Sequence, residues 1–595
     1  MEQRLSEIRH SLAHVLAIAV LRRDPGAQLA TGPVTDDGFF YDIRFSEGKA
    51  VSVDDFKDLQ KEMRSIIRKN LPFVRKAVTA QEARELFRDN PFKLEIIGGL
   101  EKEGSEITLY ETGDPGSESG TSFTDLCAGG HVGNTSEIDP ECFALKGVAG
   151  AYWHGDEKNP MLTRVSGIAF ATKAELEAHL TMLEEAKKRD HKKLGRELDL
   201  FVFSDLVGAG LPLWTPKGTL IRNLLDTYVW ELRKRHGYEQ VDIPHITKKE
   251  LYETSGHWEK FKDELFTITT REGHFFAMKP MNCPHHTQLY ARRQWSYREL
   301  PQRYANTTKV YRDEQSGELN GLSRTRAFTQ DDAHVFCRKE EIETEVLAVW
   351  DIIDTFYGSF GFSDLVVRFS RHDPEHFEKY LGTEELWNDA ERQIANILAK
   401  RGGEYIDGLG EAAMYGPKID FMAKDAIGRE WQVATIQLDF NMPERFDLSC
   451  VNEKGEKERV AMIHCAIMGS IERFMSVLIE HFAGSFPLWL APVQARVLPI
   501  GESEHGYAEE TIAQLASAGI RCDLDDSNES LGKKIRNAKL EKIPYLLVIG
   551  KNEAANKTVT LESRDQGKIG EMKIDEVIGR LTEENDSKAI TRKTA

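Results

Sequence analysis

Arginines are concentrated in the segment Val310–Cys337, VYRDEQSGELNGLSRTRAFTQDDAHVFC. They are Arg312, Arg324 and Arg326, and the polar side chains nearby are Glu314, Gln330, Asp331, Asp332 and His334. A guanidinium binds phosphate oxygens through two parallel hydrogen bonds and neutralises charge that builds at phosphorus. A solvated, charged hairpin is the simpler interpretation, but Phe328, Val335 and Phe336 alternate with the charges, so part of the segment must be buried. The segment therefore indicates a site for a nucleotide with a phosphoanhydride.

Two strands joined by a polar loop must position these side chains. Val310 and Tyr311 precede a turn over residues 316–321, and Ala327–Thr329 resumes an extended run. We expect the three arginines to project from the paired strands close to this loop.

A second group of candidate site residues lies within residues 1–172. His10 and His14 are four residues apart on a predicted helix and therefore share a face. Cys127 and His131 lie on the Gly-rich turn of residues 125–131. Such residues could close a tetrahedral metal site, form a metal-free hydrolytic or nucleic-acid pocket, or be unrelated core residues. The spacing alone leaves all three open.

The composition describes a multidomain protein of ordinary polarity. With 595 residues, 40% hydrophobic and 29% charged, the chain predicts about three to five domains. A formal net charge of −19 argues weakly against nucleic acid, because binding needs only a local basic face. The sequence contains neither a long apolar run nor a signal-peptide core, and its seven cysteines lack regular spacing, so we expect a cytoplasmic protein without a membrane span.

The pattern of strands and helices predicts an α+β multidomain fold. Residues 1–172 indicate an α/β domain, and residues 173–195 indicate a charged linker helix. Within the larger region of residues 196–488, the segments 415–421 and 431–440 read as two antiparallel strands with polar groups facing one side. Residues 493–595 alternate strands and helices, which predicts a compact α/β domain with a largely parallel sheet. Its predicted helix over residues 531–543 carries a basic face, which could be solvated or could contact RNA. The members of this face are Lys533, Lys534, Arg536, Lys539 and Lys542.

Arg312-Asp313-Glu314 with Thr329-Gln330-Asp331-Asp332-Ala333-His334 resembles motif 2 of class II aminoacyl-tRNA synthetases, in the form typical of the threonyl-tRNA synthetase family. The similarity covers nearly the whole chain, with several motifs in the family's order, and it implies that residues 196–488 form the class II catalytic domain with its antiparallel sheet. It implies a ligase that activates L-threonine with ATP and Mg²⁺ and transfers it to tRNA(Thr). Since His10 follows the first residue so closely, the resemblance further implies a short form without the ubiquitin-like N-terminal domain of many bacterial members.

The resemblance also implies a zinc site. Cys283, His334 and His464 are far apart in sequence, and without the family each would be read as a core residue. They match the family's three zinc ligands, which leave one coordination position open for the amino group and hydroxyl of threonine. Neighbouring rival candidates are His285, His286, Cys337 and Cys465. A hydroxyl-reading zinc would reject valine, whereas serine would pass and require hydrolytic correction.

Other residues acquire roles only through the family. Tyr415 and Gln437 match positions that hold the amino acid, Lys418 one that approaches ATP, and Gln432 and Thr435 positions that line the adenosine site. Arg473 in Gly469–Phe474 resembles the motif 3 arginine, which lies against the triphosphate. The implied catalytic set is Arg312, Gln330, Asp332, Tyr415, Lys418, Gln437 and Arg473. The implied ATP-binding set is Arg312, Glu314, Arg324, Phe328, Gln432, Thr435 and Arg473.

Three further assignments follow from the same resemblance. The N-terminal domain is similar to the family's editing domain, which hydrolyses Ser-tRNA(Thr) without bound zinc; its implied site residues are His10, His14, Lys93, Asp125, Cys127 and His131. The helix from Pro216 to Arg235 and the strand over residues 237–244 resemble motif 1, which implies a homodimer. Residues 493–595 resemble the anticodon-binding domain.

Alternative functions remain at this point. A synthetase for serine or proline would share the catalytic motifs but would not need both His/Cys groups. An RNA-binding regulator without catalysis would have no reason to retain Arg312, Arg324 and Arg473 together. A stand-alone deacylase would not need the long central domain.

Overall fold

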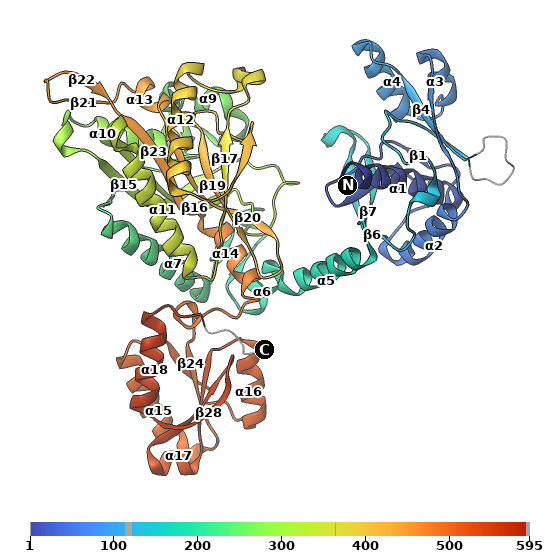
Figure 1. The fold of residues 1–595 in the computed structure, drawn as a ribbon. Coiled ribbons are helices and arrows are strands. Elements are labelled where there is room, and N and C mark those ends of the chain that lie inside the picture. Colours follow the sequence, from blue (N-terminus) through green and yellow to red (C-terminus); the bar gives the residue numbers. More distant parts are fainter. Residues whose placement is uncertain (1, 114–121, 157, 363, 591–595) are drawn as a thin grey trace. The chain divides into compact units, whose positions relative to one another are not determined.

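The computed structural model describes residues 2–113, 122–156, 158–362 and 364–590. The chain forms two compact units, unit 1 up to Glu184 and unit 2 from Glu185 onward (Figure 1). No helix among the described residues is both long enough and apolar enough to cross a bilayer.

Unit 1 is built around one helix and two small antiparallel sheets. Its sheets have the strand orders β1-β2-β7-β6 and β3-β4-β5. The helices and strands are α1 (Glu2–Arg23), β1 (Gln28–Leu29), β2 (Gly38–Arg44), α2 (Phe56–Ile67), β3 (Phe73–Ala77), α3 (Ala80–Leu86), α4 (Pro91–Glu103), β4 (Thr108–Thr112), β5 (Phe123–Leu126), β6 (Phe143–Tyr152) and β7 (Met161–Ala169).

Helix α1 is buried on all sides over residues 11–20. The segment SLAHVLAIAV has only Ser11 and His14 as polar members, so every face of the helix can lie in the core of unit 1. The sequence predicted an amphipathic helix with one apolar face, and the structure extends this to a fully buried helix. His14 is consequently 1% exposed.

The predicted linker helix is interrupted. Helix α5 (Lys173–Arg189) ends one residue before Asp190, and α6 (His191–Glu197) begins directly after it. The Asp190 side chain accepts hydrogen bonds from the backbone N–H groups of Lys192 and Lys193 and so caps α6. The prediction of one continuous helix over residues 173–195 was therefore wrong, because an N-capping aspartate starts a new helix there.

A mainly antiparallel sheet forms the centre of unit 2. Within the described residues it has the strand order β10-β15-β16-β23-β20-β19-β17-β18, with parallel pairs only at its two edges. Its strands are β10 (Glu239–Gln240), β15 (Gln302–Tyr311), β16 (Ala327–Cys337), β17 (Val366–Arg371), β18 (Tyr405–Leu409), β19 (Lys418–Lys424), β20 (Glu430–Asp439) and β23 (Ala461–Ser470). An antiparallel sheet was expected in this region from the resemblance to class II synthetases, and the strand order confirms it.

Helices cover one face of this sheet (Figure 1). The covering helices are α7 (Pro216–Arg235), α11 (Ile342–Gly358), α12 (Glu384–Arg401) and α14 (Ile471–His481). Smaller elements are β8 (Phe201–Val202), β9 (Leu213–Trp214), β11 (Ile246–Lys248), α8 (Lys249–Ser255), α9 (His257–Lys260), β12 (Thr267–Thr269), β13 (Phe275–Met278), α10 (Cys283–Ala291), β14 (Trp295–Ser296), α13 (Asn441–Arg445), β21 (Ser449–Val451) and β22 (Lys457–Arg459). The large apolar core lies between the sheet and the covering helices.

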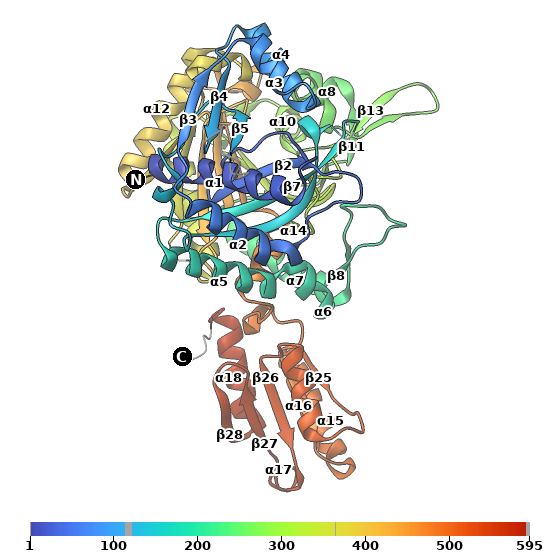
Figure 2. The same ribbon diagram turned by 90° about the vertical axis from the view of Figure 1, so that its right-hand side faces the viewer.

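The C-terminal part of unit 2 has a five-stranded sheet of order β25-β24-β26-β27-β28 (Figure 2). Its elements are β24 (Ala495–Pro499), α15 (His505–Ser517), β25 (Cys522–Leu524), α16 (Leu531–Leu540), β26 (Tyr545–Ile549), α17 (Lys551–Asn556), β27 (Thr558–Ser563), β28 (Gly567–Lys573) and α18 (Ile574–Asp586). Only β24, β25 and β26 pair in parallel, whereas β27 and β28 add antiparallel. The prediction of a largely parallel sheet is corrected to a mixed one, because β27 pairs antiparallel with β26 after the short helix α17 and a tight turn then joins β27 to β28.

The predicted basic face of residues 531–543 is not a continuous row of free charges. The Lys534 ammonium is buried and donates to the carbonyls of Pro499 and Asp525, and Lys539 pairs with Glu562 at 2.8 Å. Lys533 pairs with Glu529 at 2.7 Å. Helix α16 ends at Leu540, so the predicted helix was also too long by one turn.

Candidate functional site

A row of polar side chains crosses four strands of the central sheet. The registers place Lys418 opposite Gln437, Gln437 opposite His464, and His464 opposite His334. Directly paired residues on neighbouring strands have their side chains on the same face. Four residues that are distant in sequence are therefore side by side, on the face that the helices leave open.

The alternation of side chains along β16 separates this face from the core. Gln330, Asp332 and His334 line a cavity of about 860 Å³, which we call the central cavity. The intervening Asp331 and Ala333 point to the helices, where the Asp331 carboxylate pairs with Arg233 of α7 at 2.6 Å. Because a strand has period two, one strand supplies both the cavity and the core.

Cys283, His334 and His464 meet at one end of the central cavity, with their ligating atoms within 4.8 Å of one another. His334 Nε2 lies 3.1 Å from His464 Nδ1, and Cys283 opens helix α10. The three side chains are 3%, 1% and 8% exposed. Burial lowers the pKa of His334 well below its usual value and raises that of the Cys283 thiol well above it.

The outward ring nitrogens of both histidines are occupied. His464 Nε2 donates to the Asp439 carboxylate at 2.9 Å, and His334 Nδ1 lies 2.8 Å from His286 Nδ1. His334 Nε2 and His464 Nδ1 are left facing Cys283, as metal-binding imidazoles are commonly oriented. One thiolate and two imidazoles suit zinc and leave a fourth position for another ligand. The donor set thus fits the metal that the family resemblance implied.

The rival metal candidates have other environments. Cys465 points away from the cavity, with its Sγ 3.6 Å from the Tyr238 hydroxyl and 3.5 Å from the carbonyl oxygen of Ala333. Cys337 belongs to the core beneath the sheet. His285 is buried within α10, and His286 contacts the back of His334. Of these four, only His286 touches the cluster, and it does so from outside.

The three arginines of the segment 310–337 lie in the loop between β15 and β16, not on the strands as predicted, because the ladder ends at the pair Tyr311–Ala327. Arg324 pairs with Glu314 at 2.7 Å and Glu318 at 3.1 Å. The Arg326 Nε donates to the Glu314 carbonyl. Arg312 instead lies over the Phe328 ring and makes a 3.5 Å hydrogen bond to the Pro280 carbonyl.

Arg312 and Arg473 face the central cavity without a carboxylate within ion-pair distance in the described part of the chain. Arg473 stands in the first turn of α14, where its backbone N–H is capped by the Ser470 hydroxyl. Two uncompensated guanidinium groups in one cavity favour a polyanion such as a triphosphate. The nucleotide prediction was based on Arg312, Arg324 and Arg326, and among these three the structure pairs Arg324 and Arg326 with carboxylates.

The buried Asp420 carboxylate organises polar side chains of β19 and β20 beside the cavity. Asp420 accepts hydrogen bonds from Gln432 at 2.7 Å and from Thr435 at 2.8 Å, and it pairs with Lys418 at 3.1 Å. Gln437 donates to the Gly416 carbonyl at 2.8 Å. These contacts hold the polar side chains of β19 and β20 toward the cavity.

The remaining predicted residues also line the central cavity. Gln330 has a buried side-chain oxygen without a protein partner among the described residues. Asp332 accepts from Asn282 at 3.1 Å, and burial raises its pKa to about 6. The Tyr415 ring packs against His464 at 5.0 Å. The residues that the sequence assigned to the ATP, amino-acid and zinc sites therefore lie in or beside one cavity.

Unit 1 contains a separate cavity of about 690 Å³, which we call the N-terminal cavity. The Cys127 thiol lies 3.4 Å from His10 Nε2 and 3.2 Å from His131 Nε2, and His14 completes the cluster. Burial lowers the pKa of all three histidines and raises that of Cys127 to about 11. Neutral imidazoles and an uncharged thiol therefore face this cavity.

Lys93 and Asp125 form a buried ion pair beside that cluster. Their charged atoms are 2.5 Å apart, and the Tyr41 hydroxyl donates to the other carboxylate oxygen. Lys93 and Asp125 are 2% and 4% exposed. The turn that carries Cys127 requires glycine at 129, because φ is +116° there and a Cβ would lie 2.8 Å from the Tyr110 hydroxyl. The six predicted residues of this site thus lie together.

Sequence reasoning missed two kinds of residue. Asp439 was not singled out, although it stands two positions after Gln437 on the same face of β20, and this period-two spacing was the available signal. His257 gave no such signal. It is fully buried, its ring is 5.9 Å from that of Tyr415, and its Nε2 has no protein partner in the described part of the chain. Burial lowers its pKa to about 3.

Three family models match this chain. The tRNA synthetase class II core domain (G, H, P, S and T) matches residues 266–482. The anticodon binding domain matches residues 494–584. The threonyl and alanyl tRNA synthetase second additional domain matches residues 107–166, which include Cys127 and His131.

Similar proteins cover almost the whole length. A threonine–tRNA ligase of Thermosynechococcus vestitus is 45% identical over 98% of this chain and 95% of its own length. A threonine–tRNA ligase of Thermus thermophilus is 47% identical over 95% of this chain and 86% of its own length. The solved RNA binding domain of threonyl-tRNA synthetase from Cryptosporidium parvum Iowa II has a TM-score of 0.62 and 38% identity, covering 66% of this chain and 98% of that chain.

Proposed function

Because this chain belongs to the threonine–tRNA ligase family of ATP-using class II synthetases, we propose that the central cavity is where threonine is activated and passed to tRNA(Thr). The observation that carries this assignment is the juxtaposition of two unpaired arginines with the Cys283/His334/His464 cluster in one cavity of the described chain. Family membership also includes editing of mischarged tRNA, for which the chain has its own domain.

The adenylation step assigns tasks to the residues of the cavity. The threonine carboxylate oxygen attacks the α-phosphorus of ATP, and the bond from that phosphorus to pyrophosphate breaks. Arg312 neutralises charge at the α-phosphoryl group, and Arg473 receives the leaving pyrophosphate. Glu314 and Asp332 add two carboxyl groups to the lining of the cavity. Mg²⁺ would enter the cavity bound to ATP. Asp420 keeps Lys418, Gln432 and Thr435 turned toward the nucleotide.

Cys283, His334 and His464 would hold one zinc ion. When bound, the ion would supply Lewis acidity to the amino group and the hydroxyl of threonine. Asp439 and His286 orient the two imidazoles, and Tyr415 packs against His464 beside the amino acid.

ATP–pyrophosphate exchange with threonine, serine and valine, with metal content measured on the same sample, tests the proposal. We expect strong exchange with threonine, weaker exchange with serine, none with valine, and about one zinc per chain. Serine should be activated because a missing methyl group is worth only about 1–3 kcal/mol. Folded, zinc-loaded protein without exchange would exclude the assignment and favour the RNA-binding regulator.

We further propose that the N-terminal cavity hydrolyses Ser-tRNA(Thr). His10 and His14 line this cavity, and the neutral imidazole of His10 can accept a proton from water. The His10 ring stacks on His131 at 4.1 Å, and its Nε2 lies 3.4 Å from the Cys127 thiol. The buried Lys93–Asp125 pair lines the same cavity, with the Asp125 carboxylate 4.0 Å from His14 Nε2. In keeping with the family, we assign no metal here, although the four donors lie within 4.8 Å of one another.

The variant His10→Ala is expected to slow deacylation of Ser-tRNA(Thr) by about 10²-fold, because it removes one proton acceptor. Threonine activation should be unchanged, since that cavity belongs to unit 2. Gln3→Ala is the matched control, being an exposed residue of the same helix that lines the same cavity. Deacylation at the wild-type rate by His10→Ala would contradict the assignment of His10.

A homodimer and a cytoplasmic location complete the proposal. Around β8 and β9 lie exposed apolar side chains that a partner could cover: Val202, Phe203, Leu206, Val207 and Leu213. Sedimentation velocity at micromolar concentration should show twice the chain mass, and a single-chain mass would exclude the dimer.

All seven cysteines are free thiols, as the cytoplasm favours, and cell fractionation tests the location.

A further inference from the structure

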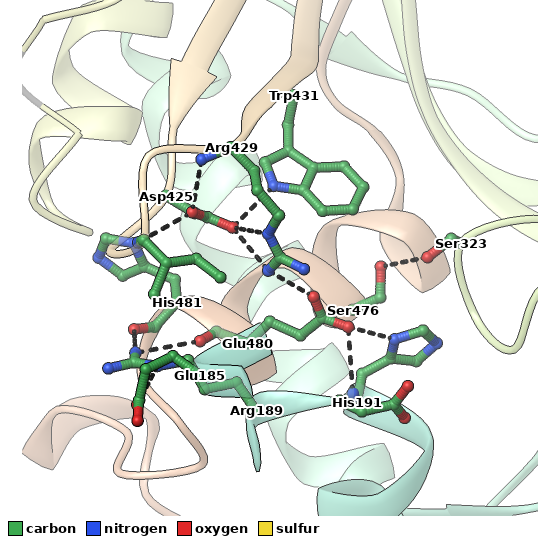
Figure 3. Close-up of polar contacts among 12 residues, drawn as sticks. Glu185, Arg189, His191, Ser323, Asp425, Arg429, Trp431, Ser476, Glu480 and His481 are labelled. Atoms are coloured by element: carbon green, nitrogen blue, oxygen red, sulfur yellow. Dashed lines mark hydrogen bonds and ion pairs between the residues drawn. The ribbon is translucent and has the colours of Figure 1, made fainter. Parts of the chain in front are cut away.

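A buried polar network joins helix α6, helix α14 and the turn between β19 and β20 (Figure 3). His191 opens α6, and Glu480 lies near the end of α14. The His191 Nδ1–H donates to Glu480 at 2.6 Å, and the His191 backbone N–H donates to the same carboxylate oxygen at 3.1 Å. His191 and Glu480 are 3% and 6% exposed. Two hydrogen bonds therefore join the short helix α6 to α14, the helix that carries Arg473.

The other nitrogen of His191 supports the loop that carries Arg312, Glu314 and Arg324. The backbone N–H of Leu322 donates to His191 Nε2 at 3.1 Å. A carboxylate only accepts hydrogen bonds, so Nδ1 must carry the proton and Nε2 must be the acceptor. The tautomer of His191 is therefore determined by Glu480, and this tautomer is the one that the loop needs.

The loop is shaped to fit against His191. Gly321 has φ of +52°, and a Cβ at this position would lie only 2.3 Å from His191 Nε2. Leu322 is 1% exposed within the main core, and Ser323 shares a 3.0 Å hydrogen bond with Ser476 of α14. Lys192 adds a hydrogen bond of 3.2 Å to Asn320. Residues 320–323 are thus held at several points from outside the cavity.

The second oxygen of Glu480 reaches a different part of the site. It pairs with Arg429 at 2.6 Å, and Arg429 pairs with Asp425 in the turn between β19 and β20. Asp425 also accepts from Trp431 Nε1 at 3.0 Å. Burial alone would raise the pKa of Glu480, but the hydrogen bonds from His191 and the charge of Arg429 outweigh it and lower that pKa. The carboxylate is therefore ionised and can hold both partners.

We propose that His191 and Glu480 are positioning residues for adenylation: Glu480 orients His191, and His191 holds the loop 312–326 in the conformation that binds ATP. The same carboxylate ties this loop to the hairpin of Lys418, Gln432 and Thr435 and to the helix of Arg473. Neither residue lines the central cavity. The inference rests on the proposed assignment of that loop to ATP.

Two substitutions separate the two hydrogen bonds of the imidazole. In His191→Asn the amide can replace the Nδ1–H donor to Glu480 but cannot reach Leu322. In His191→Gln the side-chain oxygen can replace the Nε2 acceptor for Leu322. We expect His191→Asn to raise the KM for ATP about tenfold in ATP–pyrophosphate exchange, with the KM for threonine within about twofold, because a buried N–H loses its acceptor. His191→Gln should stay within about threefold of the wild-type KM for ATP.

Hydrogen exchange of peptides that cover residues 316–326 provides a readout without catalysis. We expect faster exchange of this loop in His191→Asn and near-wild-type exchange in His191→Gln, with exchange of peptides elsewhere in unit 2 unchanged in both variants. Lys193→Ala, an exposed change on the same helix, should leave KM and exchange unchanged.

Equal KM for ATP and equal loop exchange in wild type and His191→Asn would overturn the inference. An increase in the KM for ATP in His191→Gln as large as that in His191→Asn would also overturn the inference. The hydrogen bond to Leu322 would then not be the contact that determines ATP binding. If the wild type itself showed no threonine-dependent exchange, the proposed function would fail, while hydrogen exchange would still decide whether His191 holds the loop.

Discussion

Cys283→Ala is expected to abolish zinc binding and to lower threonine activation by about 10³-fold or more. Removing the thiolate leaves two imidazoles, which hold the ion far more weakly than three donors. Asp439 and His286 would then orient histidines that have nothing to bind. Metal content by elemental analysis and ATP–pyrophosphate exchange on the same sample give the two readouts.

Cys465→Ala is the matched control for this prediction. Cys465 neighbours His464 in sequence, yet its thiol contacts Tyr238 and the Ala333 carbonyl on the core side of the sheet. We expect this variant to retain zinc and exchange. If Cys465→Ala lost the metal while Cys283→Ala kept it, the ligand set would be wrong. Chelation of wild-type protein should reproduce the Cys283→Ala result, and added zinc should restore only the wild type.

The second large effect concerns Arg312. Arg312→Lys is expected to lower kcat/KM for ATP in the exchange reaction by about 10²–10³-fold, because a lysine ammonium cannot make the bidentate contact of a guanidinium. The positive charge remains, so the fold should be unaffected. Steady-state kinetics with varied ATP and a thermal melt provide the measurement.

Arg324→Lys is the informative comparison. Arg324 comes from the same loop, but its charge is already shared with Glu314 and Glu318, whereas Arg312 has no carboxylate partner in the described residues. We therefore expect a loss of only about tenfold or less for Arg324→Lys. Equal losses in the two variants would show that charge compensation does not distinguish the two arginines.

Much of the fold could be predicted from local patterns. The strand–loop–strand interpretation of residues 310–337 was confirmed, as were the long helix over residues 216–235 and the antiparallel pair that became β19 and β20. Errors occurred where a single capping residue or a strand end decided the outcome. Asp190 split the linker helix, and the end of the ladder at Tyr311 moved three arginines from strands into the loop.

The sequence by itself determined which side chains share a face of a strand or helix, and it contained the motifs of the family. Period two along β16 assigned Gln330, Asp332 and His334 to one face and Asp331 to the other, because successive side chains of a strand alternate. The histidines at 10 and 14 shared a helix face for the equivalent reason. The family resemblance rested on the same local strings, and similarity to threonine–tRNA ligases confirmed it.

Which distant residues meet, and which charges are compensated, depended on the folded chain. The register that aligns Lys418, Gln437, His464 and His334 follows from how four strands pair, and no local pattern contains that information. Arg312 and Arg324 are equivalent in sequence, but only the folded loop gives Arg324 two carboxylate partners. No local sequence pattern identified His191 as a positioning residue. Its two side-chain hydrogen bonds join it to Leu322, 131 positions later in the chain, and to Glu480, 289 positions later. Such contacts form only when core packing has brought the segments together.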